Sequence, residues 1–335
     1  MHDSIMVSFS KTAVLRICYT TRTTNEQMKE RYPDLHAEGI VRNRADAAYE
    51  ILSDCTLCPH TCHVDRPAGE TGFCRTGDTL IISSYSPHFG EEPPLVGRRG
   101  SETIFFTNCN LGCIFCQNYQ INQCGRGFQV HTEDLAEIML RLQERGCHNI
   151  NLVSPTHQVP EILRALDIAA GRRTRISYPD RLTIPAGMMQ SKPCTSLMES
   201  LTSICRMRST GATGSLTLSS GVPDYVDRMK EALSEMHRQV RDIIIRDGIA
   251  ERGMIIRHLV LPGGLAGTEE VLRFIADELS LSTYLNIMPQ YLPAWKVWEI
   301  DCVPEALRLR ITQEEFDDAL ATAREYGLNR GFSNR

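Results

Sequence analysis

The repeated order of strand and helix from residue 101 onward constrains the fold more than any other feature of this chain. The β-branched and aromatic run "TIFFT" (103–107) suits a buried strand, and a helix that Thr132 can cap and Gly146 can end follows it. Further strands are predicted at 149–153, 254–263 and 284–288, and further helices from near Pro160, over 226–240, over 269–279 and from the capping box Thr312 to Glu315. Because such units require crossover connections, they predict an α/β fold with a parallel sheet, either doubly wound or a barrel of the TIM kind.

Cysteine usage narrows the class of function. The chain of 335 residues holds 13 cysteines, and no apolar run is long enough for a membrane span. Its first twenty residues carry Asp3, Lys11 and Arg16, where a signal peptide needs an apolar stretch. We therefore expect a cytoplasmic protein whose cysteines bind metal or carry out redox chemistry. The net charge of −5 and the scattered basic residues argue against nucleic acid as a partner, and no membrane association is expected.

Three cysteines stand in a short loop directly after the first predicted strand. "TNCNLGCIFCQN" (107–118) contains Cys109, Cys113 and Cys116. Three thiolates can ligate three irons of a [4Fe–4S] cluster and leave the fourth iron open, whereas four cysteines would saturate it. The spacing alone leaves structural zinc or an ordinary electron-transfer cluster as alternatives.

The sequence around this loop resembles the radical S-adenosylmethionine (radical SAM) superfamily, in which an aromatic residue stands where Phe115 does. Within it, "CIFCQN", "GCHNINLVSPTHQVPEIL", "RHLVLPG" and "LNIMPQY" resemble uncharacterised relatives of the pyruvate formate-lyase activating enzyme, from about residue 51 to the C-terminus with one gap. The resemblance implies a partial (β/α)6 TIM-like barrel. It also implies a [4Fe–4S] cluster whose open iron binds S-adenosylmethionine, with Phe115 near the adenine, and reductive cleavage to a 5′-deoxyadenosyl radical.

The same resemblance implies further cofactor-binding residues. The loop after the second strand, with Ser154, Thr156 and His157, would hold the methionine end of the cofactor. On the fifth strand Arg257 and His258, and after the sixth Gln290, would point toward the cavity. Taken alone, a histidine such as His157 or His258 is more often a hydrogen-bonded structural residue.

The implied partners follow from the family. They are a glycyl-radical enzyme, whose glycine would lose a hydrogen atom, and a low-potential electron donor of the flavodoxin or ferredoxin type. Nothing in the residues names the substrate, and a small-molecule radical reaction stays open. The alternative of another class is a non-catalytic iron–sulfur or zinc protein, either an electron carrier or an inactive radical SAM relative.

A second cysteine group precedes the first strand. Cys55, Cys58, Cys62 and Cys74 follow a C-x2-C-x3-C-x11-C pattern, and Gly69 and Gly72 allow the chain between them to fold back. Four thiolates can close a site for zinc or for a second iron–sulfur cluster, while unliganded reduced cysteines are the alternative. We accordingly expect an N-terminal lead-in over 1–50, a cysteine-rich metal-binding module over 51–100 and a radical SAM partial barrel over 101–335.

Residues 172–220 break the strand and helix rhythm. The segment is rich in Ser and Thr and shows no strand run of useful length. Read one base earlier through synonymous codons, 197–210 gives "DGVVDIYMPDAKY", which resembles the family's fourth barrel strand. We therefore predict a frameshift in this stretch. If the chain exists as written, we expect cluster ligands without a complete cofactor site, and a misfolded half of the barrel.

Overall fold

The computed structural model describes residues 32–172, 182–186, 203–209 and 225–332. Its strands are β1 (Ile81–His88), β2 (Ser101–Phe106), β3 (Phe128–Gln129), β4 (Ile150–Val153), β5 (Leu182–Ala186), β6 (Ser203–Ser209), β7 (Ile244–Arg246), β8 (Ile249–Leu259) and β9 (Tyr284–Met288). Its α-helices are α1 (Tyr32–Ala37), α2 (Ile40–Glu50), α3 (Pro93–Val96), α4 (Tyr119–Asn122), α5 (Thr132–Glu144), α6 (Val159–Gly171), α9 (Tyr225–Val240), α10 (Thr268–Phe274) and α11 (Gln313–Glu325). None of these described helices is long and apolar enough to cross a membrane.

Six strands run parallel and neighbour one another in chain order. They are β2, β4, β5, β6, β8 and β9. Strand β1 is antiparallel to β2 and to β3, and β7 is antiparallel to β8. In the part of the chain that the structure describes, β9 pairs with β8 and not with β1 or β3, so the sheet stays open. The predicted parallel α/β sheet is confirmed, without closure into a full barrel.

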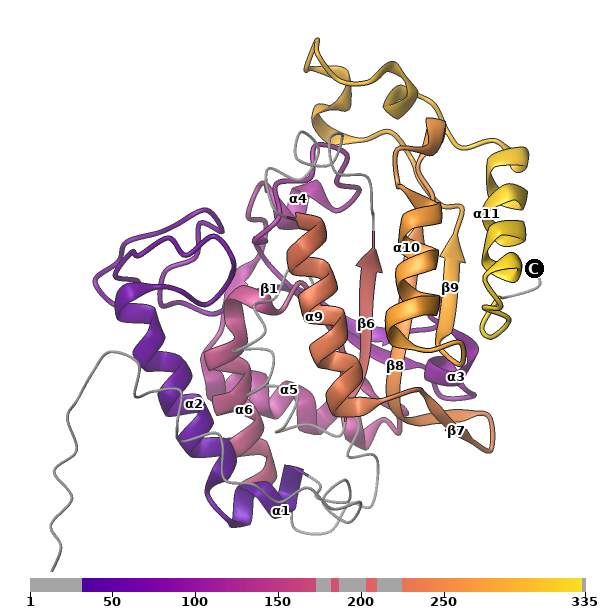
Figure 1. Cartoon of the computed structure of the whole chain (residues 1–335). Helices are drawn as coiled ribbons and strands as arrows, with labels where there is room; N and C mark the ends of the chain where they lie inside the picture. The colour runs from indigo at the N-terminus through magenta and orange to yellow at the C-terminus, as the bar shows by residue number, and fades with distance from the viewer. Residues whose placement is uncertain (1–31, 173–181, 187–202, 210–224, 333–335) are drawn as a thin grey trace, which may run out of the picture. The chain divides into compact units, whose positions relative to one another are not determined.

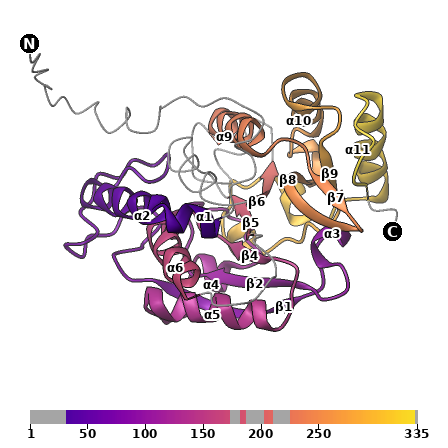
Figure 2. The ribbon, with the colours of Figure 1, turned by 90° about the horizontal axis from the view of Figure 1, so that it is seen from below.

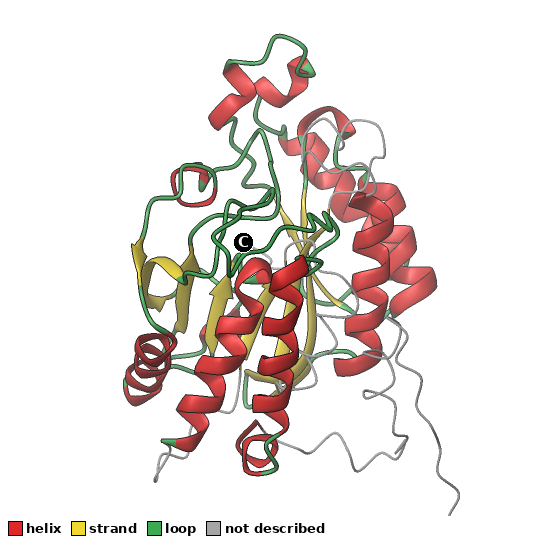
Figure 3. Cartoon of the chain, turned by 90° about the vertical axis from the view of Figure 1, so that its left-hand side faces the viewer, coloured by secondary structure: helices red, strands yellow, loops and turns green. Residues whose placement is uncertain are grey.

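Helices α5, α6 and α9 cover one face of this sheet. Strand residues such as Ile104, Leu152, Ile256 and Leu285 are buried in the same core as the apolar stripes of α5, α6 and α9. In Figure 1 the arrows of β6 and β9 point upward and α4 lies toward their upper ends, while Figure 2 shows α5, α6, α9 and α10 outside the row of strands. Figure 3 shows many of the long loops at one end of the strands. That end is where the candidate residues are found.

Because strand side chains alternate, the other face of the sheet carries the intervening residues. Several of these are polar: Thr103 on β2, Asn151 on β4, Arg257 on β8 and Asn286 on β9. Helix α3 packs against β8 on this side, where Leu95 and Ile255 share a small core. The inner face of the sheet therefore carries both this apolar contact with α3 and a row of polar side chains.

The expected module boundaries fall inside packed structure. Residues 32–50 form α1 and α2, and α2 packs on α6. Strand β1 lies in the expected cysteine-rich module but pairs along β2, so residue 100 does not end a separate sheet.

The N-terminal cap of α5 differs from the prediction. The N-cap is His131, whose backbone N–H donates to Asp134 Oδ2 at 2.9 Å, and Thr132 is already helical.

The expectation that 172–220 supplies no strand is wrong, because β5 and β6 continue the sheet between β4 and β8. Backbone hydrogen bonds do not depend on the side chains, so the open edges of β4 and β8 can pair with a segment of weak strand propensity. Two strands in parallel register also do not agree with a misfolded half of the barrel. Residues 173–181, 187–202 and 210–220, on which most of the frameshift prediction falls, lie outside the described residues.

Candidate functional site

The three-cysteine loop begins where β2 ends and is followed by the short helix α4. Asn108 takes a left-handed conformation, with φ 70°, which turns the chain out of the strand. Cys109 Sγ then accepts a hydrogen bond from the N–H of Leu111 at 3.4 Å, and the N–H of Cys116 donates to the carbonyl of Cys113 at 3.2 Å. The prediction that this loop lies at the carboxyl end of a parallel strand is confirmed.

The loop places its first thiol in a buried position. Cys109 is 9% exposed, while Cys113 and Cys116 are half-buried. Burial raises the pKa of Cys109 to about 11, because a buried thiolate loses its hydration. A metal centre would supply the positive charge that the thiolate form needs.

Two neighbouring side chains reach the cysteine sulfurs. Asn122, the last residue of α4, lies with its Nδ2 3.6 Å from Cys116 Sγ. The single hydrogen of the Ser154 hydroxyl can be donated to Asn122 Oδ1, 3.4 Å away, or to the Cys109 sulfur, and the second arrangement opposes the effect of burial on the pKa of Cys109. Ser154 follows β4 with φ 56°, so this turn carries its hydroxyl to the cysteine loop. Ser154 thus lies beside the cysteines, and Asn122 is a site residue that sequence reasoning missed.

The other two residues predicted in this loop are buried beneath it. Thr156 and His157 belong to the 3₁₀ turn Thr156–Gln158 and are 2% and 1% exposed. His157 Nε2 donates to the carbonyl of Thr107 at 2.8 Å, directly before the cysteine loop. Burial lowers the pKa of His157 to about 4, so the ring is neutral at pH 7. In this structure His157 supports the cysteine loop from below, and its role toward a cofactor stays a prediction.

Arg257 lies on the inner face of β8, as expected, but two carboxylates from the segment before α3 bind it. Its Nε donates to Glu92 Oε1 at 2.5 Å and its Nη2 to Glu92 Oε2 at 2.6 Å, and Nη2 also pairs with Glu91. Asn286 and Asn151 donate to Glu92 and Glu91, both at 2.8 Å. Sequence reasoning missed this network, in which the carboxylates of Glu91 and Glu92 neutralise the positive charge of Arg257.

The prediction that His258 also points toward the cavity is wrong. Its Nε2 lies 2.9 Å from Thr268 Oγ1 at the start of α10, on the helix-covered face, and the residue is fully buried. Because adjacent side chains on a strand point to opposite faces, Arg257 and His258 cannot both line the inner side. His258 is a packing residue between β8 and α10.

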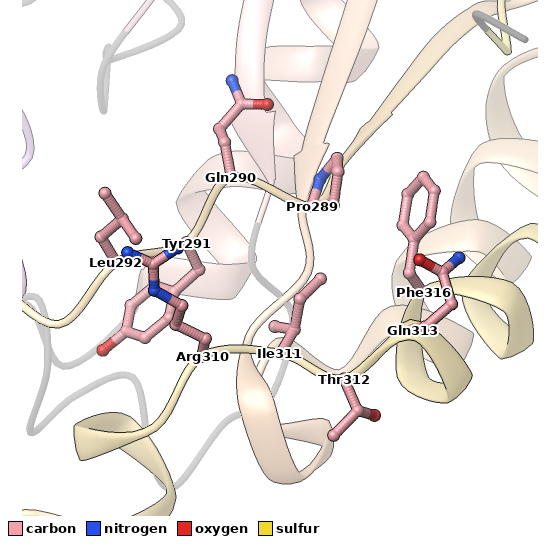
Figure 4. Close-up of a pocket in the computed structure, with 9 residues that line it drawn as sticks. All are labelled: Pro289, Gln290, Tyr291, Leu292, Arg310, Ile311, Thr312, Gln313 and Phe316. Carbon is pink, nitrogen blue, oxygen red and sulfur yellow. The ribbon is translucent and has the colours of Figure 1, made fainter. Parts of the chain in front are cut away.

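The cysteine loop contacts the segment after β9 at the two predicted residues Phe115 and Gln290, each through a different partner. The carbonyl of Gln290 accepts a hydrogen bond from Gln117 Nε2 at 2.8 Å, and the ring of Phe115 packs edge-on against Tyr291 with 5.7 Å between centroids. Gln290 and Tyr291 also line a cavity of about 380 Å³ between the segment after β9 and the start of α11. Figure 4 shows its lining residues Pro289, Gln290, Tyr291, Leu292, Arg310, Ile311, Thr312, Gln313 and Phe316. Both predicted residues therefore connect the cysteine loop to this cavity.

The four cysteines of the first group lie in one compact loop. The N–H of Cys55 donates to Val64 O at 3.0 Å and the N–H of His63 returns to Cys55 O at 3.1 Å. Gly72 approaches Cys62 so closely that a Cβ there would lie 2.6 Å from the Cys62 sulfur, which explains the glycine. Burial raises the pKa of Cys58 to about 12, and Cys74, Cys62 and Cys55 lie near enough to add to the shift.

The chemistry of the donors fits metal–sulfur clusters. Backbone N–H groups donate to Cys109 Sγ and, from Phe73, to Cys62 Sγ at 3.4 Å, and such hydrogen bonds stabilise thiolate ligands and set cluster potentials. Within the described ranges, no three His, Cys, Asp or Glu side chains are gathered closely enough to hold a single metal ion. The binding of metal by the seven cysteines of the two groups stays a prediction.

Comparison with known proteins agrees with the placement of the loop. The family described as the radical SAM superfamily matches residues 103–188, which begin in β2 and include the three cysteines. An uncharacterized protein of Methanocaldococcus jannaschii is 31% identical over 306 residues, covering 85% of this chain and 79% of that protein. The chain therefore belongs to the radical SAM superfamily.

Proposed function

We propose that the protein is a radical SAM enzyme that reductively cleaves S-adenosylmethionine. The observation that carries the proposal is the thiol of Cys109 at the carboxyl end of β2, with Leu111 N–H as its donor and Ser154 beside it. Cys113 and Cys116 complete the loop. The radical SAM family itself implies a [4Fe–4S] cluster and S-adenosylmethionine.

The proposal assigns a role to the cysteines of this loop and to the residues around it. Cys109, Cys113 and Cys116 hold three irons, and the bound cluster supplies an open iron and one electron for cleavage to methionine and a 5′-deoxyadenosyl radical. Phe115, held edge-on by Tyr291, packs near the adenine. Ser154, beside the cysteines, is proposed to meet the methionine end, while Thr156 lies buried beneath it, and Gln290 lines the cavity between the segment after β9 and the start of α11.

The substrate proposed from the family resemblance is a glycyl-radical enzyme. The radical would abstract a hydrogen atom from a glycine of that partner, and a flavodoxin or ferredoxin would supply the electron. We place this reaction in the cytoplasm, where cysteines stay reduced. The Cys55, Cys58, Cys62 and Cys74 group is proposed as a second metal site, for zinc or for iron and sulfur.

One observation favours a second candidate function, a non-catalytic iron–sulfur or zinc protein. The guanidinium of Arg257 is bound by Glu91 and Glu92, so an inner-face cation predicted to meet the cofactor is occupied. A frameshift within 172–220, which we keep as a proposal, would remove further cofactor contacts. Resequencing of the gene tests it, and a continuous reading frame without a nearby insertion or deletion would contradict it.

Anaerobic reconstitution separates the two functions. The full chain, loaded with iron and sulfide and reduced with dithionite, is incubated with S-adenosylmethionine. Formation of 5′-deoxyadenosine supports the enzyme. A reducible cluster that is unaffected by S-adenosylmethionine supports the carrier. A chain rewritten in the shifted frame should form the product faster than the chain as written.

A further inference from the structure

The cavity at the start of α11 combines apolar walls with one cation. Its volume is about 380 Å³, and Pro289, Leu292, Ile311 and Phe316 supply apolar surface to it. Arg310 is the one charged residue among the described residues of the lining. In Figure 4 its side chain is drawn toward Leu292, while Phe316 stands at the opposite end of the lining. Such a cavity suits an apolar group that carries a negative charge beside it.

Polar groups elsewhere in the lining have partners within the chain. The hydroxyl of Tyr291 donates to the carbonyl of Leu307 at 2.6 Å, and Gln313 Nε2 donates to Asp317 Oδ1 at 2.9 Å. In the part of the chain that the structure describes, Arg310 makes no hydrogen bond or ion pair. A carboxylate that reaches this guanidinium would therefore gain a charge-assisted hydrogen bond without displacing another group.

The apolar surface continues beyond the cavity. Leu309 is 61% exposed and Trp298 is 62% exposed. Arg308 donates to the carbonyls of Val297 at 3.2 Å and Ile300 at 3.0 Å, which brings the turn that carries Trp298 close to the segment that carries Leu309. Exposed aromatic and aliphatic side chains beside a cavity are typical of a surface that binds another protein. They offer more apolar area than a small ligand in the cavity would cover.

The same surface is fastened to the three-cysteine loop. The ring of Tyr119, at the start of α4, stacks on Trp295 with 4.8 Å between centroids. Trp295 has a positive φ, 59°, which for tryptophan persists only where packing holds it. The bond from Gln117 Nε2 to the carbonyl of Gln290 joins the same two segments. A partner bound over the cavity would therefore lie beside the cysteine loop.

We propose that the cavity and the apolar surface beside it bind a peptide segment of the protein substrate. One apolar side chain of that segment enters the cavity and an adjacent aspartate or glutamate pairs with Arg310. Further apolar side chains cover Trp298 and Leu309. The inference rests on the proposed function, because it states how the substrate of that enzyme is recognised. It selects a protein substrate over a small molecule.

Binding is tested by isothermal titration calorimetry on the full reconstituted chain without S-adenosylmethionine. One probe is the peptide Leu-Leu-Gly-Phe-Glu-Gly, acetylated and amidated so that its glutamate is the only carboxylate, and the other is 3-phenylpropionate. The peptide should bind more tightly than the small acid. Replacing its glutamate by glutamine, or its phenylalanine by alanine, should weaken binding about tenfold. No binding of the peptide, or equal binding of the glutamine peptide, would overturn the proposal.

Arg310→Gln tests the ion pair. It should weaken binding of the glutamate peptide about tenfold and leave binding of the glutamine peptide unchanged, because both changes remove the same interaction. Arg98→Gln is the matched control, since Arg98 is an exposed arginine outside the lining, and it should bind as the wild type does. Losses that add when Arg310→Gln meets the glutamine peptide would show that the two groups do not pair.

Trp298→Gln and Leu309→Gln test the surface beyond the cavity. Both side chains are exposed, so the fold should tolerate the changes. Each should weaken binding of the peptide several-fold and leave 3-phenylpropionate unaffected, whereas the control Leu281→Gln, at a residue that is 56% exposed, should change neither. Equal affinity for the two probes, with no effect of these variants, would indicate a site for small acids and overturn the protein partner.

The two proposals fail in different ways. Formation of 5′-deoxyadenosine is measured without peptide, and peptide binding is measured without S-adenosylmethionine. Product formation without peptide binding would refute the docking surface alone. Peptide binding with the stated pattern, by a chain that forms no product, would refute the proposed function.

Discussion

The guanidinium of Arg66 lies 3.6 Å from the carboxylate of Glu161, and the two side chains are 1% and 2% exposed. Arg66 comes from the cysteine-rich segment and Glu161 from α6. Arg66 also donates to the carbonyls of His157 at 3.0 Å and Gly77 at 2.7 Å. This buried cation therefore fastens the cysteine-rich segment to the loop after β4, which itself supports the three-cysteine loop.

Arg66→Met should destabilise the protein strongly. It leaves the carboxyl of Glu161 buried without its cation and two carbonyls without a donor, and breaking such a pair costs about 3–5 kcal/mol. Urea unfolding of the metal-free chain measures the loss. Arg98→Met is the control, since Arg98 is exposed, and it should change stability by less than about 0.5 kcal/mol. Equal stability of the two variants would contradict the proposed anchoring role.

Glu161→Gln should change how stability depends on pH. Burial raises the pKa of Glu161 to about 7, against the opposing effect of Arg66, so the folded state binds a proton that the unfolded state has released. Between the ordinary pKa near 4.5 and about 7, this group makes the wild type less stable as pH rises.

The variant lacks this titration. Its free energy of unfolding minus that of the wild type should therefore increase from pH 5 to pH 8, on the order of 1–3 kcal/mol. Urea titrations at both pH values measure it, and the difference cancels background titrations such as that of His157. A constant difference would show that Glu161 is ionised throughout.

Ser154→Gly should shift the midpoint potential of the cluster on the three-cysteine loop to a more negative value. Glycine keeps the left-handed turn, with φ 56°, while removing the hydroxyl whose one hydrogen can be donated to the Cys109 sulfur or to Asn122 Oδ1. Hydrogen bonds to ligand sulfur favour the reduced cluster, and the loss of one corresponds to roughly 20–60 mV for a one-electron couple. A redox titration monitored by electron paramagnetic resonance (EPR) measures it. The control is Asp247→Gly, because Asp247 also has positive φ, 52°, but lies in the exposed turn between β7 and β8. An unchanged potential would place the hydroxyl outside the sulfur environment.

The sequence predicted the regular part of the fold because periodicity and caps are local signals. Strand β2, helix α9 and the Thr312 cap of α11 follow directly from their residue patterns. The hairpin of β7 and β8 was missed, although the dipeptide Asp247-Gly248, with φ 52° and 78°, is a local turn signal that could have found it.

The site was predicted where a motif marks it and missed where distant segments meet. The position of the cysteine loop follows from its strand. The pairing of Glu91 and Glu92 with Arg257, and the reach of Asn122 to Cys116, depend on contacts between segments far from any motif. His258 was misplaced because the alternation of side chains along β8 was not applied to adjacent residues.

The most direct test of the account is EPR spectroscopy of the reduced protein with and without S-adenosylmethionine. The spectra are recorded on the Cys55→Ser/Cys58→Ser variant, so that only the three-cysteine loop can hold a cluster. The control is Cys302→Ser in the otherwise unchanged chain, because Cys302 is exposed and lies outside both cysteine groups. The account predicts a [4Fe–4S] signal that changes when S-adenosylmethionine binds and disappears in Cys113→Ser. Zinc on the three cysteines, or a fully ligated cluster that does not respond to S-adenosylmethionine, would contradict it.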